Sequence, residues 1–182
     1  MRVSVVGSLH LDIMVAAPRL PQRDETLMGS SWHYKCGGKG GNQAVAAAQL
    51  GARVAFGGRI GKDEFGARLK ANLVTAGVDI SCLAVDEVSG SGMSVAISEA
   101  TGDYGAVIVS GSNLVIDPDD AGKAFARLGG APILILQNEV PEAVNLAVAR
   151  KAKETGARVI LNAAPARALS QKLIEFIDLL VV

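Results

Sequence analysis

Short apolar runs alternate along this chain with longer segments of helical periodicity. The run Val3–Val6 predicts a buried strand that ends at Gly7 and is extended by Asp12–Val15. Residues 42–50 are rich in alanine and predict a helix that ends at Gly51. Further strands are predicted at residues 54–56, 133–136 and 159–161, and further helices at 63–77, 117–128, 141–155 and from 170 onward. Alternation of apolar strands with helices predicts a parallel sheet with helices on both faces.

Two segments break this rhythm and predict a second, smaller sheet. Residues 26–36 have no helical period, and residues 91–109 read as two strands around the turn Thr101–Asp103. In the first of these strands, Ser94 and Ala96 alternate with apolar residues, so one face is small or polar and the other is apolar. We expect a small antiparallel sheet formed by approximately residues 16–36 and 89–109, attached to an α/β core of approximately 1–15, 37–88 and 110–182.

The last apolar run, Leu179–Val182, is predicted to be a central strand of the larger sheet. In open α/β sheets the chemistry usually lies in the loops that follow the carboxyl ends of such strands. No residue follows this run. We therefore expect the domain to be truncated after Val182.

Composition narrows the function classes. The chain has 182 residues, 49% of them hydrophobic, and 18 basic residues balance 18 acidic ones. This predicts one domain whose core needs no disulfide or metal. Because the net charge is zero and aromatic residues are few, we expect neither a nucleic acid nor a membrane as partner. The apolar segment of a signal peptide would have to continue through His10 and Asp12, whose polar side chains interrupt it. Cys36 and Cys82 are the only thiols, too few for a disulfide framework. We therefore expect a cytoplasmic protein.

The segment from Cys36 to Gln43 is the most unusual stretch. Four glycines fall in five positions around Lys39, directly before the alanine-rich helix. Glycines allow a ligand to approach the backbone closely, and a helix N-terminus offers unpaired N–H groups. The segment is not a Walker A loop, because Gly40 follows Lys39, and the dinucleotide-binding pattern fails at Gln43. From the residues alone, a ligand-binding loop and a plain glycine-rich turn both stay open.

Two carboxylates are predicted at one edge of the larger sheet. Asp12 lies beyond the first strand, and Glu139, with Gln137 and Asn138, follows the strand at 133–136. Carboxylates accept charge-assisted hydrogen bonds from hydroxyl groups, so this edge suits a polyhydroxylated ligand. The alternative is that Asp12 is a solvated loop residue.

With these residues in view, the chain resembles the ribokinase family of sugar kinases, also called the PfkB carbohydrate kinases. The stretch Gly37–Ala44, with Leu50–Ala52 after it, is similar to the family's first signature. Shorter motifs recur at the family's spacing: Val6–Ser8 with Asp12, Pro21 with Glu25 and Thr26, Gly58–Gly61 with Asp63 and Gly66, Gly111–Asn113, Gln137 with Glu139, and Asn162–Ala166. The resemblance covers all 182 residues.

The resemblance implies a fold and an activity. The fold would be an α/β, ribokinase-like three-layer core with a mainly parallel sheet, and a small β-sheet lid that closes over a sugar. The activity would be transfer of the γ-phosphoryl group of ATP to a sugar hydroxyl. By position in the motifs, the residues that line the sugar site would be His10, Asp12, Gly38, Lys39, Asn42 and Glu139.

One of these positions departs from the family pattern. The place of His10 is normally Asn in ribokinase-like sequences. A neutral imidazole is bulkier than an amide and offers one donor and one acceptor. The sequence therefore leaves the identity of the sugar open, and His10 as a histidine without a ligand role stays an alternative.

Other parts of the family's machinery would lie beyond Val182. These are the Gly-Ala-Gly-Asp turn with the catalytic base and anion hole, the nucleotide pocket, the monovalent-cation site, and an Asn-x-x-Glu motif associated with magnesium-bound phosphates. The resemblance thus implies ATP, Mg²⁺ and a monovalent cation, with their sites mostly outside this chain. It places neither a catalytic residue nor a metal ligand within the 182 residues, which alone are expected to be inactive.

Two functions follow as alternatives. The first is a sugar kinase of which this chain is the sugar-binding half. The second is an inactive half-kinase that holds a sugar or pairs with another subunit. The resemblance also implies a homodimer through the lid, whose apolar face, with Met93, Val95 and Ile97, would close partly over the sugar and partly be covered by the second lid.

Overall fold

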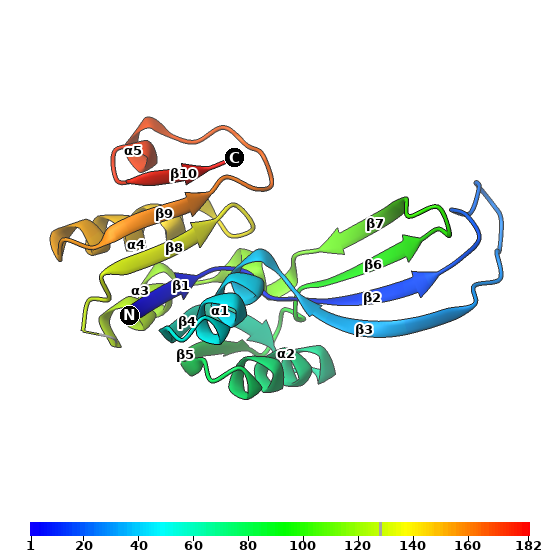
Figure 1. Ribbon diagram of the computed structural model, residues 1–182, viewed down its shortest axis with the longest axis horizontal. Coiled ribbons are helices and arrows are strands. Elements are labelled where there is room, and N and C mark those ends of the chain that lie inside the picture. The colour runs from blue at the N-terminus through cyan, green and yellow to red at the C-terminus, as the bar shows by residue number, and fades with distance from the viewer. Residues whose placement is uncertain (128) are drawn as a thin grey trace.

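The computed structural model describes residues 1–127 and 129–182, and in these ranges the chain forms a larger and a smaller sheet (Figure 1). The larger sheet has the strand order β10-β9-β8-β1-β4-β5, and every neighbouring pair is parallel. Its strands are β1 (Arg2–Val6), β4 (Arg53–Gly61), β5 (Asp79–Asp86), β8 (Ile133–Gln137), β9 (Arg158–Asn162) and β10 (Leu179–Val181). The predicted parallel sheet is confirmed.

Helices cover both faces of this sheet, as the alternation predicts. Side chains of β1 point alternately to the two faces: Val3 and Val5 join the core under α1 (Lys39–Gln49) and α2 (Glu64–Thr75). Val6 joins the core on the opposite face, under α3 (Pro118–Arg127) and α4 (Glu142–Glu154). The helix α5 (Gln171–Ile174) contributes Leu173 to this second core. None of the helices in the described ranges combines the length and apolar character that a membrane crossing requires.

The predicted helix ends are largely confirmed. Gly51 and Gly77 follow α1 and α2 with φ of +83° and +75°, values that glycine adopts without a steric penalty. Asp63 caps α2 by accepting the N–H of Gly66 at 2.7 Å. The start of α1 was predicted at residue 42, but the helix begins at Lys39, because the glycine-rich stretch itself forms its first turn. The predicted end of the third helix at Leu128 lies outside the described residues.

The smaller sheet, called the lid sheet below, has the order β3-β2-β6-β7 and extends to one side of the core (Figure 1). Its strands are β2 (His10–Ala16), β3 (Ser31–Gly37), β6 (Met93–Ser98) and β7 (Tyr104–Val109). Two expectations are corrected. The sheet is mixed rather than antiparallel, because β2 and β6 run parallel. Residues 10–15 belong to it rather than to the core, because the chain leaves β1 at Val6 and pairs with β3 and β6 from His10 onward.

Two edge strands differ from the prediction. β5 was not predicted, because its residues are only half buried and its apolar run, Cys82–Val85, is short and flanked by polar residues. The run at 179–182 was expected at the centre of the sheet. Within the described residues β10 lies at its edge, where Leu179, Leu180 and Val181 are 42–47% exposed.

Candidate functional site

A cavity of about 390 Å³ lies where the lid sheet meets the core. Its walls come from β2, β3, β6 and β7 of the lid sheet, from the start of α1, and from the loop after β8. All six residues that the sequence singles out line this one cavity: His10, Asp12, Gly38, Lys39, Asn42 and Glu139. The structure therefore brings them together, while their role in binding stays a prediction.

Parallel pairing explains why distant residues meet here. β1 and β8 are parallel neighbours, with Val3 opposite Ile133, so the loops that follow the two strands leave the sheet at the same edge. Ser8 and His10 then lie beside Glu139, although 131 residues separate Ser8 from Glu139 in the sequence. Glu139 follows β8 at the expected edge of the larger sheet, but the expectation that Asp12 lies at the same edge is wrong, because Asp12 reaches the cavity from β2 of the lid sheet.

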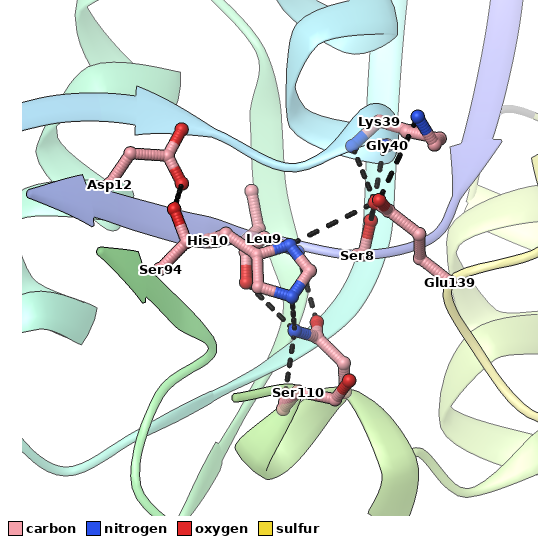
Figure 2. A network of polar contacts seen from close by, with 10 residues as sticks. Ser8, Leu9, His10, Asp12, Lys39, Gly40, Ser94, Ser110 and Glu139 are labelled. Atoms are coloured by element: carbon pink, nitrogen blue, oxygen red, sulfur yellow. Dashed lines mark hydrogen bonds and ion pairs between the residues drawn. The ribbon is translucent and has the colours of Figure 1, made fainter. Parts of the chain in front are cut away.

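Glu139 is the centre of a polar network (Figure 2). Its Oε2 accepts hydrogen bonds from the Ser8 hydroxyl and from the backbone N–H of Lys39, the latter at 2.8 Å. Its Oε1 lies 3.9 Å from the Lys39 ammonium. The carboxylate thus faces the N-terminus of α1, whose free N–H groups and dipole favour a negative charge. These contacts hold Glu139 in one position at the cavity wall.

The glycines of the loop serve close packing of backbone against backbone. Gly38 has φ of +85°, and a Cβ there would lie 2.8 Å from backbone atoms of Ser8, Leu9 and His10. A Cβ on Gly40 would lie 2.7 Å from the Ser8 nitrogen. Only glycine therefore allows the start of α1 to pack against residues 7–10. This packing brings the N-terminus of α1 to the cavity.

Asp12 and Ser94 connect two strands on the cavity face of the lid sheet. The Ser94 hydroxyl donates to Oδ1 of Asp12 (Figure 2). Ala96 and Ile108 line the cavity from the same face. The expectation that the apolar face with Met93, Val95 and Ile97 closes over the ligand is wrong. Strand alternation directs the small and polar residues of β6 to the cavity instead.

His10 is 4% exposed and lies between two cavities. The second cavity, of about 300 Å³, shares His10, Ile108 and Glu139 with the first. Burial lowers the pKa of His10 below 6.5, Glu139 and Asp12 act in the opposite direction, and Lys39 adds to the lowering. The neutral form of the imidazole is therefore the main one at pH 7.

Sequence reasoning missed the residues that position this site. Ser8 links Glu139 to the glycine-rich loop, since its hydroxyl also accepts the N–H of Gly40 at 3.4 Å. Asn113, in the 3-10 helix η1 (Gly111–Val115), is fully buried and bonds to the backbone of Leu9. Both fall within motifs noted from the sequence. Their roles depend on contacts with residues far along the chain, which local patterns do not reveal.

The described residues form no cluster suited to a metal ion. In the ranges 1–127 and 129–182, no three His, Cys, Asp or Glu side chains come together in a way that could hold one.

The chain is similar in sequence to known carbohydrate kinases. A family model described as pfkB family carbohydrate kinase matches residues 1–182. The ribokinase of Haemophilus influenzae is 35% identical over 179 residues, and the match covers 98% of this chain and 58% of that protein. The ribokinase of Bacillus subtilis is 36% identical, with 95% and 59% covered.

Solved structures of ribokinases share the fold of this chain. The structure of Arabidopsis thaliana ribokinase complexed with ribose and ATP matches with a TM-score of 0.88 and 31% identity, covering 98% of this chain and 59% of that one. A ribokinase structure from Thermotoga maritima matches with a TM-score of 0.84 and 28% identity, covering 99% and 58%. The chain thus spans a little under three fifths of these relatives' length. The family model that matches residues 1–182, together with the similarity to these ribokinases in sequence and fold, shows that the chain belongs to the pfkB family of carbohydrate kinases.

Proposed function

We propose that the full-length protein transfers the γ-phosphoryl group of ATP to a hydroxyl of a sugar, and that this chain supplies the sugar-binding site. One observation carries the proposal: Asp12, Glu139 and Asn42 meet around a single cavity between the core and the lid sheet. Membership of the pfkB family and similarity to ribokinases support it.

The chemistry of the lining suits a polyhydroxylated ligand. The two carboxylates accept hydrogen bonds from hydroxyl groups, and the Asn42 amide both donates and accepts. Lys39 provides a cation beside Glu139. A sugar held by several such groups is fixed in position and orientation. Phosphoryl transfer depends mainly on positioning and on electrostatic stabilisation, so this fixing is the contribution of the chain to the reaction.

The lid sheet has a second role in this proposal. Ala96, Ala106 and Ile108 give the cavity an apolar wall opposite the core. A sugar enclosed there is shielded from bulk water. Shielding strengthens the hydrogen bonds to the carboxylates and limits transfer of the phosphoryl group to water.

The catalytic base, the nucleotide pocket and the cation sites are proposed to lie outside the 182 residues. Within the described ranges, Glu139 is already engaged by Ser8 and Lys39, and Asp12 by Ser94. We assign these carboxylates to binding. ATP, Mg²⁺ and a monovalent cation are proposed as requirements of the full-length protein, and its location in the cytoplasm stays a prediction.

The test is phosphorylation by the full-length protein. Ribose, 2-deoxyribose and fructose are each incubated with ATP and magnesium, and sugar phosphate and ADP are quantified while calorimetry measures binding of the same sugars. Sugar-dependent ADP and a sugar phosphate are expected for at least one sugar, and none is expected from the 182 residues alone. Binding without turnover would instead support the inactive sugar-binding module. Neither binding nor turnover would contradict both functions.

We also propose that the protein is a homodimer through its lid sheets. On the face that turns away from the cavity, Val107 and Val109 of β7 are 70% and 53% exposed. β7 is an edge strand, and exposed apolar edges favour pairing with another chain. A twofold interface would cover the same patch on both subunits.

A further inference from the structure

The orientation of the Asn113 amide is determined by three backbone contacts. Its Oδ1 accepts the N–H of Leu9 at 2.9 Å. Its Nδ2 donates to the carbonyl of Leu9 at 2.8 Å and to that of Ser110 at 2.9 Å. Reversing the amide would set its NH₂ group against an N–H and its oxygen against two carbonyls. The backbone therefore fixes which end of the amide is the donor.

That fixed donor lies beside the imidazole of His10. Nε2 of His10 is 3.4 Å from Nδ2 of Asn113. Because an amide NH₂ group donates and does not accept, a proton on Nε2 would face another donor. The two amide hydrogens already bond to the carbonyls of Leu9 and Ser110, so Nε2 can only share one of them at its longer distance. An unprotonated Nε2 is still the compatible state, because the NH₂ group offers no acceptor for an Nε2–H. In a neutral histidine the proton is then on Nδ1.

The ring has little freedom to choose another arrangement. A Cβ placed on Gly92 would lie 2.2 Å from Asn113 Nδ2 and 2.8 Å from Cδ2 of His10, so the backbone of Gly92 packs closely on both. A half-turn of the ring would exchange Nδ1 with Cδ2 and Nε2 with Cε1. Both nitrogens would then lose the polar neighbours they have here, Asn113 and Glu139.

Nδ1 faces Oε2 of Glu139 at 3.8 Å (Figure 2). This distance is too long for a direct hydrogen bond. It leaves room for one oxygen atom that contacts both groups, and both residues line the cavity. A hydroxyl group fits this place, because its oxygen accepts from the Nδ1–H and its hydrogen is donated to the carboxylate.

We infer that Asn113 is a positioning residue that holds His10 in the Nδ1–H form, and that His10 and Glu139 together bind one ligand hydroxyl group. The identification of that ligand as a sugar rests on the proposed function. A hydroxyl is selected over a hydrogen, which makes neither bond, and over a methoxy group, which cannot donate. It is also selected over an ammonium group, which cannot accept.

The first test observes the tautomer directly and needs no sugar. Full-length protein labelled with ¹⁵N-histidine is studied near pH 7.5 by two-bond ¹H–¹⁵N spectroscopy, which distinguishes Nδ1–H from Nε2–H rings. The signals of His10 are those that His10→Asn removes, and His33, which is exposed, is the comparison ring. An Nδ1–H pattern is expected, shifting towards Nε2–H in Asn113→Ala. An Nε2–H or doubly protonated ring in the unaltered protein would overturn the inference, whatever the fate of the variant.

The second test measures what the pair selects. The preferred sugar of the phosphorylation assay is compared with its deoxy and O-methyl analogues at each hydroxyl, by KM and kcat. Removal or methylation of the hydroxyl at one position is expected to raise KM about 10- to 150-fold, the effect of one hydrogen bond to a charged group. The accompanying change in kcat should be smaller.

Two variants at position 10 make the second test specific. In His10→Asn, the introduced amide can place its NH₂ group where Nδ1–H lies in histidine, so this variant should keep the discrimination at that hydroxyl. His10→Leu should reduce it to a few-fold. Equal discrimination in His10→Leu and unaltered protein would overturn the inference while leaving the kinase function intact. Loss of binding for every sugar would instead refute the proposed function, and the tautomer measurement would still decide the role of Asn113.

Discussion

At the scale of single residues, the burial and the charged neighbours of His10 determine its pKa. Burial lowers its pKa and the cation of Lys39 adds to this, whereas Glu139 and Asp12 raise it, with a net lowering from 6.5. In the unfolded chain these neighbours are absent. The unfolded state therefore takes up a proton at a higher pH than the folded state does.

This difference predicts a pH dependence of stability. Well above pH 6.5 the histidine is neutral in both states and has no effect on the slope. As the pH falls through 6.5 towards the lower folded pKa, only the unfolded state gains the proton, so the free energy of unfolding decreases. Urea unfolding at several pH values between about 8 and 5 should show a steeper loss for the unaltered protein than for His10→Asn. His33→Asn is the matched control, and identical slopes for His10→Asn and the unaltered protein would be the contrary result.

Gly38 and Gly51 allow backbone strain to be separated from steric clash. Both have positive φ, +85° and +83°, but a Cβ on Gly51 would meet nothing within 4 Å. Gly51→Ala should therefore cost about 1–2 kcal/mol, the left-handed backbone penalty alone. Gly38→Ala adds contacts of 2.8 Å with the backbone of residues 8–10 and should cost clearly more. Chemical denaturation measures both, and equal losses would show that the loops are not tightly packed.

At the scale of elements, prediction succeeded where burial is continuous. β1 and β8 lie inside a parallel sheet with helices on both faces, so their apolar runs are visible in the sequence. β5 is half buried at an edge, and its short apolar run Cys82–Val85 was not recognised as a strand. β2 was recognised as extended, but its sheet was assigned wrongly, because pairing with β3 and β6 is a long-range property.

Asp63 connects helix α2 to the lid sheet. Its carboxylate accepts the N–H of Gly66 and both the N–H and hydroxyl of Ser91, each at 2.7 Å, and Ser91 is buried two residues before β6. Asp63→Ala removes a cap worth about 0.5–2 kcal/mol and leaves the Ser91 donors unpaired, at about 1–3 kcal/mol more. Ser170→Ala, which removes only a bond to the N–H of Leu173, is the control. Unfolding curves should show the larger loss for Asp63→Ala, and a smaller or equal loss would mean that Ser91 finds other partners.

At the scale of the whole molecule, the candidate site belongs to neither sheet alone. Asp12 comes from the lid sheet, Asn42 from α1 and Glu139 from the loop after β8. The sequence identified these residues through strand ends, the glycine-rich loop and the family resemblance. It could not show the distances between them, nor the bonds of Ser8 and Asn113, because these depend on packing between segments that lie 100 or more residues apart.

The exposed apolar face of the lid sheet predicts the oligomeric state. Val107→Asp places a charge in the proposed twofold interface and should convert a dimer to a monomer at micromolar concentration, as measured by light scattering. Val88→Asp is the control, since Val88 is 96% exposed in the loop after β5. A monomeric unaltered protein, or a Val107→Asp variant that stays dimeric, would refute the lid-to-lid dimer.

The central claim is that this cavity holds the sugar, and steady-state kinetics of full-length Asp12→Ala and Asn42→Ala test it most directly. Each variant removes hydrogen bonds to the sugar, and a lost bond to a charged group costs about 1.5–3 kcal/mol, or roughly 10- to 150-fold. Asp24→Ala, at a carboxylate that is 93% exposed, is the control. The account predicts that KM for the sugar rises by this factor in Asp12→Ala, and also rises in Asn42→Ala, while KM for ATP stays close to that of the control. Unchanged sugar kinetics in both variants would contradict it.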